Sequence, residues 1–145
     1  PADESPPPAA DRQVPVTASG GNETILLAED DETVRALAVR VLERAGYRVR
    51  AEATGEAALR AFEAEPRAYD LLLFDMVMPD MGGLEAYRRI RALRAGVPAL
   101  FVSGYSLAEF EDDEAITLVQ KPYSQDALLS AVREALARTR NPGAV

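Results

Sequence analysis

From residue 24 onward, short apolar runs alternate with longer segments in which apolar residues recur about every 3.6 positions, the repeat of an α-helix. The apolar runs predict five strands, at residues 24–29, 47–53, 70–75, 97–103 and 115–119. The periodic segments predict five helices, at residues 31–45, 55–65, 83–94, 107–113 and 124–138.

Residue types at the boundaries support these ranges. Gly46 closes the first predicted helix, Pro66 stops the second, and the side chain of Ser124 can cap the last. The strand at 70–75 is apolar enough to be buried on both faces. The strand at 47–53 is more polar, which favours a place near the edge of the sheet.

Strands that alternate with helices form βαβ units, which give a parallel sheet with helices on both faces and right-handed crossovers. The pattern therefore predicts the α/β class, as a doubly wound five-stranded parallel sheet in one domain at residues 23–139. In such folds the functional residues lie at the carboxyl ends of the strands, near a switch in strand order.

The two ends of the chain differ in composition from this domain. Residues 1–22 hold five of the ten prolines, with small and acidic residues between them, and predict a flexible linker. We interpret it as a natural interdomain tether rather than a remnant of an expression vector. Residues 140–145 form a short C-terminal tail.

Composition excludes several kinds of chemistry. The chain has neither cysteine nor histidine, so it can hold no disulfide, zinc–thiolate site, imidazole base or phosphohistidine. A net charge of −8 disfavours direct binding to nucleic acid, because the phosphate backbone is also negatively charged. No apolar run approaches the roughly 20 residues of a membrane helix, and no signal peptide is visible. We therefore expect a cytoplasmic domain with no membrane contact of its own.

Polar residues follow four of the predicted strands at the same edge of the sheet. They are Glu29, Asp30 and Asp31 after the first strand, Asp75 at the end of the third, Ser103 at the end of the fourth, and Lys121 after the fifth. Each has an ordinary structural reading: Asp31, for example, stabilises the start of a helix. Their coincidence at one edge favours a shared site.

The chemistry of that set is specific. Adjacent carboxylates repel each other, and a divalent cation relieves the repulsion. With oxygen ligands alone, the site favours Mg²⁺ or Mn²⁺ over zinc. A carboxylate beside such an ion can attack a phosphoryl group, while a lysine and a hydroxyl stabilise charge on the transferring oxygens.

Four segments carry a resemblance to the response-regulator receiver domain of two-component systems. They are ILLAEDDETVR (Ile25–Arg35), LLLFDMVMPDMGGLE (Leu71–Glu85), FVSGYS (Phe101–Ser106) and QKPYS (Gln120–Ser124). The resemblance covers about Thr24 to Arg138, and it implies a flavodoxin-like (βα)5 fold with strand order 2-1-3-4-5.

The resemblance also implies roles for the residues of the site. Asp75 is similar to the phosphoacceptor, which takes its phosphoryl group from a phosphohistidine. Asp30 corresponds to a direct Mg²⁺ ligand, Glu29 to one that acts through water, and the main-chain carbonyl of Val77 to a third ligand. Domains of this type phosphorylate and slowly dephosphorylate themselves with Mg²⁺, and are not kinases.

Further expectations concern the fourth and fifth strands. The resemblance implies that Ser103 and Lys121 bind phosphoryl oxygens and that Pro122 follows a cis peptide bond. Ser103 is then drawn to the phosphoryl group as a switch. Leu118 stands where many members carry a switch aromatic, so we expect a different readout, and Tyr105 is a candidate for it.

The partner implied is a histidine kinase or a histidine phosphotransfer domain, in a bacterial protein. The proline-rich leader and the absence of an initial methionine favour a receiver cut from a multidomain protein. The leader running into GGNETILLAEDDE, together with FVSGY, resembles the C-terminal receivers of hybrid sensor histidine kinases, with a membrane-tethered parent as one form. The alternative is a stand-alone regulator.

A homodimer through the fourth helix, fifth strand and last helix is a further expectation, on a face that is acidic at 109–114. Two other readings stay open. A degenerate receiver that serves as a docking module is one. A haloacid-dehalogenase-type phosphatase is the other, but it needs a second acid two residues after Asp75, where Val77 stands.

Overall fold

The computed structural model describes residues 22–104 and 116–140. Nine helices and strands lie in those ranges: β1 (Thr24–Ala28), α3 (Glu32–Arg44), β2 (Arg48–Glu52), α4 (Gly55–Ala64), β3 (Leu71–Asp75), α5 (Gly83–Leu93), β4 (Ala99–Ser103), β5 (Ile116–Gln120) and α6 (Gln125–Arg140). Each agrees with a predicted element to within a few residues at either end. The predicted helix at 107–113, residues 1–21 of the predicted linker and residues 141–145 of the predicted tail lie outside the described ranges. Arg140, the predicted first residue of the tail, is instead the last residue of α6.

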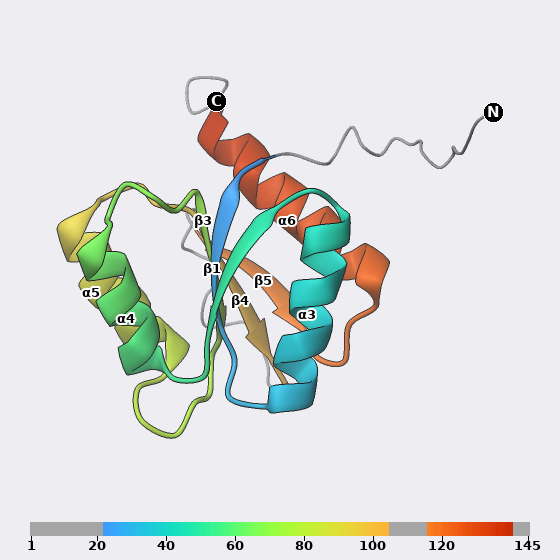
Figure 1. Cartoon of the computed structure of the whole chain (residues 1–145), viewed down its shortest axis with the longest axis horizontal. Helices are drawn as coiled ribbons and strands as arrows, with labels where there is room; N and C mark the ends of the chain where they lie inside the picture. The colour runs from blue at the N-terminus through green and yellow to red at the C-terminus, as the bar shows by residue number, and fades with distance from the viewer. Residues whose placement is uncertain (1–21, 105–115, 141–145) are drawn as a thin grey trace.

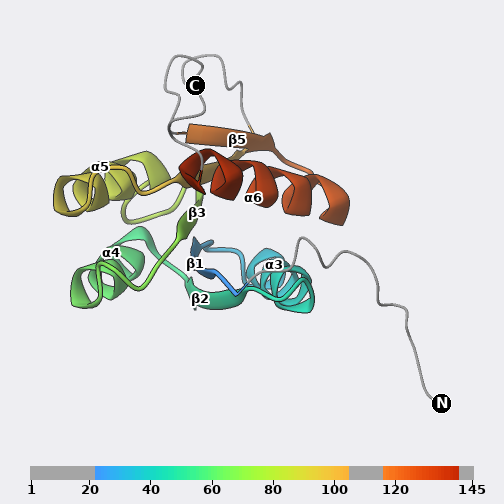
Figure 2. The ribbon, with the colours of Figure 1, turned by 90° about the horizontal axis from the view of Figure 1, so that it is seen from above.

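The five strands form one parallel sheet in the order β2-β1-β3-β4-β5, which confirms the doubly wound α/β prediction. Figure 2 shows the two helical layers: α4 and α5 cover one face of the sheet, and α3 and α6 cover the other. The polar strand β2 lies at one edge, as its sequence indicates. The strand order switches at β1, because β2 lies on one side of it and β3 on the other (Figure 2).

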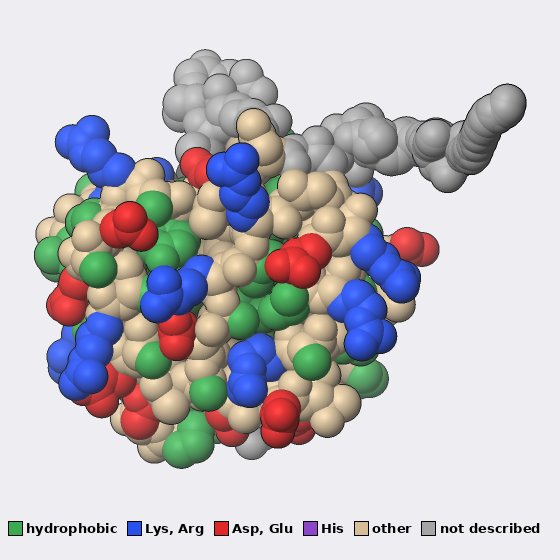
Figure 3. Space-filling model, viewed as in Figure 1, with side chains coloured by type: hydrophobic (Ala, Val, Ile, Leu, Met, Phe, Trp, Pro, Cys, Tyr) green, Lys and Arg blue, Asp and Glu red, His purple; other side chains and the backbone are tan. Residues whose placement is uncertain are grey.

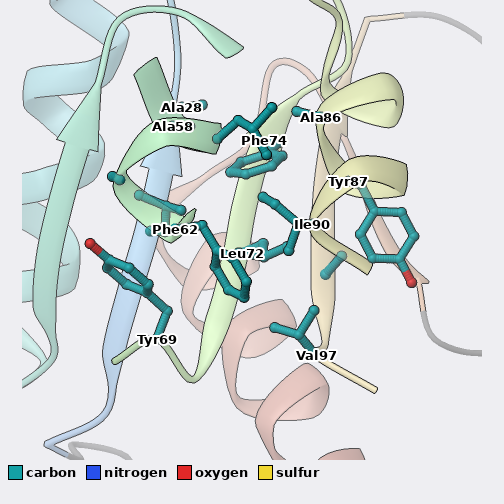
Figure 4. Packing of buried hydrophobic residues seen from close by; sticks show 14 of the residues in the cluster. Ala28, Ala58, Phe62, Tyr69, Leu72, Phe74, Ala86, Tyr87, Ile90 and Val97 are labelled. Atoms are coloured by element: carbon teal, nitrogen blue, oxygen red, sulfur yellow. The ribbon is translucent and has the colours of Figure 1, made fainter. Parts of the chain in front are cut away.

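Strand β3 is the centre of the core, and all five of its residues are buried. Because side chains alternate along a strand, Leu72 and Phe74 point to one face and Leu71 and Leu73 to the other. The first pair packs with α4 and α5, as Figure 4 shows for Phe62 and its neighbours. The second pair packs with α3 and α6. Asp75 is therefore the last residue of a strand that both cores hold in place.

Side chains cap the helices at the sites that the sequence predicts. The carboxylate of Asp31 accepts the N–H groups of Thr33 and Val34 at the start of α3. The hydroxyl of Ser124 accepts from Ala127 at the start of α6, which confirms that cap. After α3, Gly46 has a φ of 102°, a conformation that glycine adopts without strain.

Surface charge is mixed on the face shown in Figure 3, where acidic and basic side chains are interspersed. Among the exposed charged residues of the described ranges, Glu56 pairs with Arg60 on α4 and Glu85 pairs with Arg89 on α5. Exposed pairs of this kind contribute little to stability. Among the described residues, no helix combines the length and the apolar character that a membrane span requires.

The start of α5 lies directly against the end of β3. A Cβ atom added to Gly83 would stand 2.4 Å from the carbonyl oxygen of Asp75, too close for any side chain. The contact is with backbone, so it cannot be relieved by turning a flexible side chain. Glycine at this position lets the chain fold back beside Asp75.

We predict that Gly83→Ala lowers the free energy of unfolding by about 2 kcal/mol, because the new methyl group forces backbone to move. Urea unfolding measures the change. The matched control is Gly104→Ala, where an added Cβ meets none of the described residues within 4 Å, so the change should stay within about 0.5 kcal/mol. Alanine favours a helix by up to about 1 kcal/mol over glycine, so a neutral or stabilising Gly83→Ala would contradict the steric argument.

Candidate functional site

The parallel register of the sheet brings the polar strand ends together. Ala28 of β1 pairs with Phe74 of β3, so Glu29 and Asp75 each follow at the same level. Asp75 in turn pairs with Val102 of β4, one residue before Ser103. The backbone N–H of Lys121 donates to the carbonyl oxygen of Ser103 at 2.8 Å, which carries the ladder one step beyond β5.

Three carboxylates gather at this edge. Glu29, Asp30 and Asp75 each offer an oxygen, and these oxygens all lie within 4.8 Å of one another. Glu29 and Asp75 are buried, whereas Asp30 is exposed to solvent. At that distance each charged pair repels by about 3 kcal/mol at an effective dielectric constant near 20. The fold therefore holds together groups that would separate if they were free.

Lys121 bridges two of the three carboxylates. Its Nζ lies 2.9 Å from Oδ2 of Asp75 and 3.2 Å from Oε1 of Glu29. Burial lowers the pKa of Lys121, but the hydrogen bonds and charges of Asp75 and Glu29 outweigh it and raise the pKa above its ordinary value. The lysine is thus a stable ammonium. One positive charge against three negative ones leaves the site with an excess of negative charge.

The pKa of Glu29 reflects its burial and its charged neighbours. Burial, followed by the negative charge of Asp75, raises the pKa of Glu29 to about 7. The Asp31 N–H, which donates to Oε2 at 3.0 Å, and the Lys121 ammonium act in the opposite direction but do not restore the ordinary value. The described protein groups alone therefore do not fully stabilise the negative charge of the Glu29 carboxylate.

The residues present fit a hard divalent cation. Every donor in the cluster is a carboxylate oxygen, which suits Mg²⁺ rather than zinc or copper. One ligand is exposed, which leaves a way in for the ion and for an anion that shares it. Burial is the main reason why the pKa of Glu29 is raised, and a bound cation would offset the smaller contribution from the charge of Asp75.

Backbone and side-chain donors hold Asp75 and Glu29 in place. The N–H of Val77 donates to Oδ1 of Asp75 at 3.1 Å, while Lys121 contacts the other oxygen. The guanidinium of Arg35 on α3 donates to the carbonyl oxygen of Glu29 at 2.9 Å. Both carboxylate oxygens of Asp75 thus have a hydrogen-bond donor.

The peptide bond between Lys121 and Pro122 is cis, as predicted.

The structure places the predicted site residues as follows. Glu29, Asp30, Asp75 and Lys121 lie together, and Ser103 is buried at the end of the neighbouring strand. Asp31 caps α3 instead of joining the carboxylate cluster, in agreement with its expected role.

The predicted switch residues are placed less completely. Leu118 is partly buried and packs against the core cluster that contains Tyr87 and Phe101. Tyr105 and the acidic segment 109–114 of the expected dimer face lie outside the described residues.

Two residues near the site were not predicted. Arg35 holds the backbone of Glu29, a contact that depends on how α3 packs and leaves no mark in the local sequence. Tyr123 is the second. Burial raises its pKa, and the charges of Glu29 and Asp75 add to the effect. The Tyr123 side chain therefore interacts electrostatically with the carboxylate cluster. Its position two residues after Lys121 could have indicated that it lies nearby.

Comparison with known proteins supplies independent evidence. Residues 25–133 match the family model of the response regulator receiver domain. The chain is 34% identical over 142 residues to the sensor kinase CckA of Brucella abortus (strain 2308), a match that covers 94% of this chain and 15% of the kinase. It is 33% identical over 116 residues to the response regulator receiver protein CpdR of the same strain, covering 77% of this chain and 95% of that protein.

A solved structure agrees with the sequence comparisons. A CheY-like response regulator receiver domain protein from Methanospirillum hungatei JF-1 superposes with a TM-score of 0.76 at 31% identity, covering 85% of this chain and all of that one. The fold, the arrangement of strand-end residues and the family match agree. The chain belongs to the response regulator receiver domains of two-component systems.

Proposed function

We propose that this receiver domain accepts a phosphoryl group on Asp75. The observation that carries the proposal is the contact of Lys121 with Asp75 and Glu29 inside a cluster of three carboxylates. An isolated buried aspartate would pair with one cation and be neutral overall. Here the additional carboxylates can coordinate a divalent ion, and a dianionic phosphoryl group can then bind beside that ion.

In the proposed reaction a carboxylate oxygen of Asp75 attacks phosphorus, and an acyl phosphate bond forms. The bond between phosphorus and the donor's imidazole nitrogen breaks, and its electron pair leaves with that nitrogen. The Lys121 ammonium and the Ser103 hydroxyl, which lie at neighbouring strand ends, would donate to phosphoryl oxygens. The Val77 N–H restricts the rotation of the Asp75 carboxylate before the attack.

Asp30, Glu29 and Asp75, together with the main-chain carbonyl of Val77, are the proposed Mg²⁺ ligands, with Glu29 acting through water. When bound, Mg²⁺ would neutralise charge on the transferring phosphoryl oxygens. The protein's part is to keep the ligands in place. Glu29 is fixed through the Asp31 N–H and through Arg35, and Asp75 through Lys121 and the end of β3.

We also propose how phosphorylation is transmitted. The phosphoryl group brings close to two negative charges and three acceptor oxygens, which draw the Ser103 hydroxyl towards Asp75. Motion at Ser103 displaces the chain that follows β4. Leu118 has no ring to turn, so the usual aromatic readout is absent, and Tyr105 is the candidate to replace it.

The donor is proposed to be a phosphohistidine on another domain, because this chain has no histidine. We favour a hybrid sensor kinase as the parent protein. The match to the sensor kinase CckA covers 94% of this chain, whereas the match to CpdR covers 77%. The broader match supports a kinase-like origin, and a stand-alone regulator is the alternative.

The first prediction concerns the acceptor. Incubation with acetyl phosphate and Mg²⁺ should add one phosphoryl group, seen by intact mass, and Asp75→Asn should abolish the gain because an amide is not a nucleophile here. The matched control is Asp70→Asn, at the opposite end of β3, where Asp70 accepts the Thr24 N–H. This variant should be phosphorylated like the parent. Phosphorylation of Asp75→Asn at the parent rate would refute the assignment.

The second prediction concerns the metal. Mg²⁺ at roughly a hundred times its Kd should raise the free energy of unfolding by about 3 kcal/mol, measured by thermal or urea unfolding. Asp30→Asn should lose most of this gain, yet be at least as stable as the parent without metal, because one repelling charge is removed.

Asp31→Asn is the control for that experiment, since it changes the adjacent residue in the same way. Asparagine caps a helix about as well as aspartate, so this variant should keep both its stability and its response to Mg²⁺. An undiminished Mg²⁺ response in Asp30→Asn would remove Asp30 from the ligand set.

The third prediction concerns the parent protein. If the chain is the receiver of a hybrid kinase, the coding sequence upstream of Pro1 should encode a helix with a phosphorylatable histidine and a nucleotide-binding domain. Sequencing that region decides the point, because a start codon directly before the proline-rich segment would instead indicate a stand-alone regulator.

A further inference from the structure

Asp80 lies in the loop 76–82, between β3 and α5, and its carboxylate contacts the start of α4. Oδ1 accepts the N–H of Gly55 at 3.2 Å, and Oδ2 accepts the N–H of Glu56 at 2.9 Å. First-turn N–H groups have no acceptor within their own helix. The cap residue Thr54 accepts only from a later one, that of Ala57. Asp80 therefore completes the cap of α4 from another part of the chain.

The loop and the helix are in close contact at this point, and Figure 1 shows the loop passing next to the start of α4. A Cβ atom on Gly55 would stand 2.2 Å from the carbonyl oxygen of Met81, so the two backbones touch. Desolvation acts to raise the pKa of Asp80, but the N–H groups of Glu56, Met81 and Gly55 together hold it below its ordinary value. An ionised carboxylate at a helix N-terminus is also favoured by the helix dipole.

The same loop carries backbone of the proposed phosphoacceptor site. It begins directly after Asp75, and the N–H of Val77 donates to Oδ1 of Asp75. The Val77 side chain is 56% exposed, so packing of that side chain does not hold the backbone. The next residue, Met78, is buried in the core, and Met76 and Met81 pack against the same cluster. The loop backbone is held by hydrogen bonds, from the Gly83 N–H to the carbonyl of Met76 and from the start of α4 to Asp80.

We propose that Asp80 is a positioning residue, which holds the loop 76–82 on the first turn of α4 and thereby sets the main chain of Val77 against Asp75. The consequence for metal binding and phosphoryl transfer rests on the function proposed for Asp75. The attachment itself is a property of the metal-free protein. It can therefore be tested separately from the chemistry.

The first measurement is the NMR order parameter of the Val77 N–H in the metal-free chain. Asp80→Ala should lower it from the range of rigid backbone, about 0.85, towards about 0.6. Asp80→Asn should give an intermediate value, since its side-chain oxygen accepts one of the two N–H groups. Thr54→Ala removes the other cap of the same helix without touching the loop, and should leave the Val77 value unchanged.

The second measurement uses Mg²⁺ and acetyl phosphate. Asp80→Ala should weaken Mg²⁺ binding, followed by calorimetry, and slow phosphorylation by about 10-fold or more, the usual effect of losing a residue that orients a ligand. Thr54→Ala should lower the melting temperature as well, yet change neither quantity by more than about twofold.

The outcomes are distinguishable. If Asp80→Ala keeps the parent's Val77 order parameter and Mg²⁺ affinity and loses only stability, as Thr54→Ala does, Asp80 is a helix cap and the proposal is wrong. If the parent chain neither binds Mg²⁺ nor becomes phosphorylated while Asp80→Ala still mobilises Val77, the function proposed for Asp75 fails and the attachment stands.

Discussion

The fold has to hold mutually repelling carboxylates together at one end of its parallel sheet, and the rest of the structure provides the stability for this. One carboxylate oxygen each of Glu29, Asp30 and Asp75 lies within 4.8 Å of the others, and the Lys121 ammonium contacts both Glu29 and Asp75. The folding free energy of the whole domain has to cover this cost. It does so through β3, which is buried on both faces, and through the ladder that aligns β1 with β3. The site is unfavourable locally and stable only as part of the sheet.

Most of the fold could be predicted because its elements differ in local pattern. The run Leu71–Asp75 is too apolar for any place but the centre, and the polar run Arg48–Glu52 suits an edge. The predicted ends were less accurate. The strand expected at 97–103 begins at Ala99, although the Pro98 carbonyl still accepts from Leu72. Strand ends depend on where the neighbouring strand offers partners, which a single segment does not reveal.

The residues of the site that the sheet topology alone brings together could be predicted from the sequence. Parallel strands place their carboxyl ends at one edge, so the positions of Glu29, Asp75 and Lys121 in the sequence sufficed to bring them together. The supporting contacts were not predictable. Arg35 reaches Glu29 only because of the angle at which α3 packs, and Asp80 meets α4 across more than twenty residues of sequence. Such contacts arise from tertiary packing and follow no periodicity.

The alternation of side chains along β3 has a mechanical consequence. Leu71 and Leu73 pack into one helical layer and Leu72 and Phe74 into the other, so the strand that ends in Asp75 cannot shift without pressing on both. Close-packed interiors resist compression. A small displacement at the carboxyl end therefore presses on both layers, and the softer layer moves further. The way in which such a domain reports a change then depends on the compliance of its two helical layers as well as on the chemistry at the strand end.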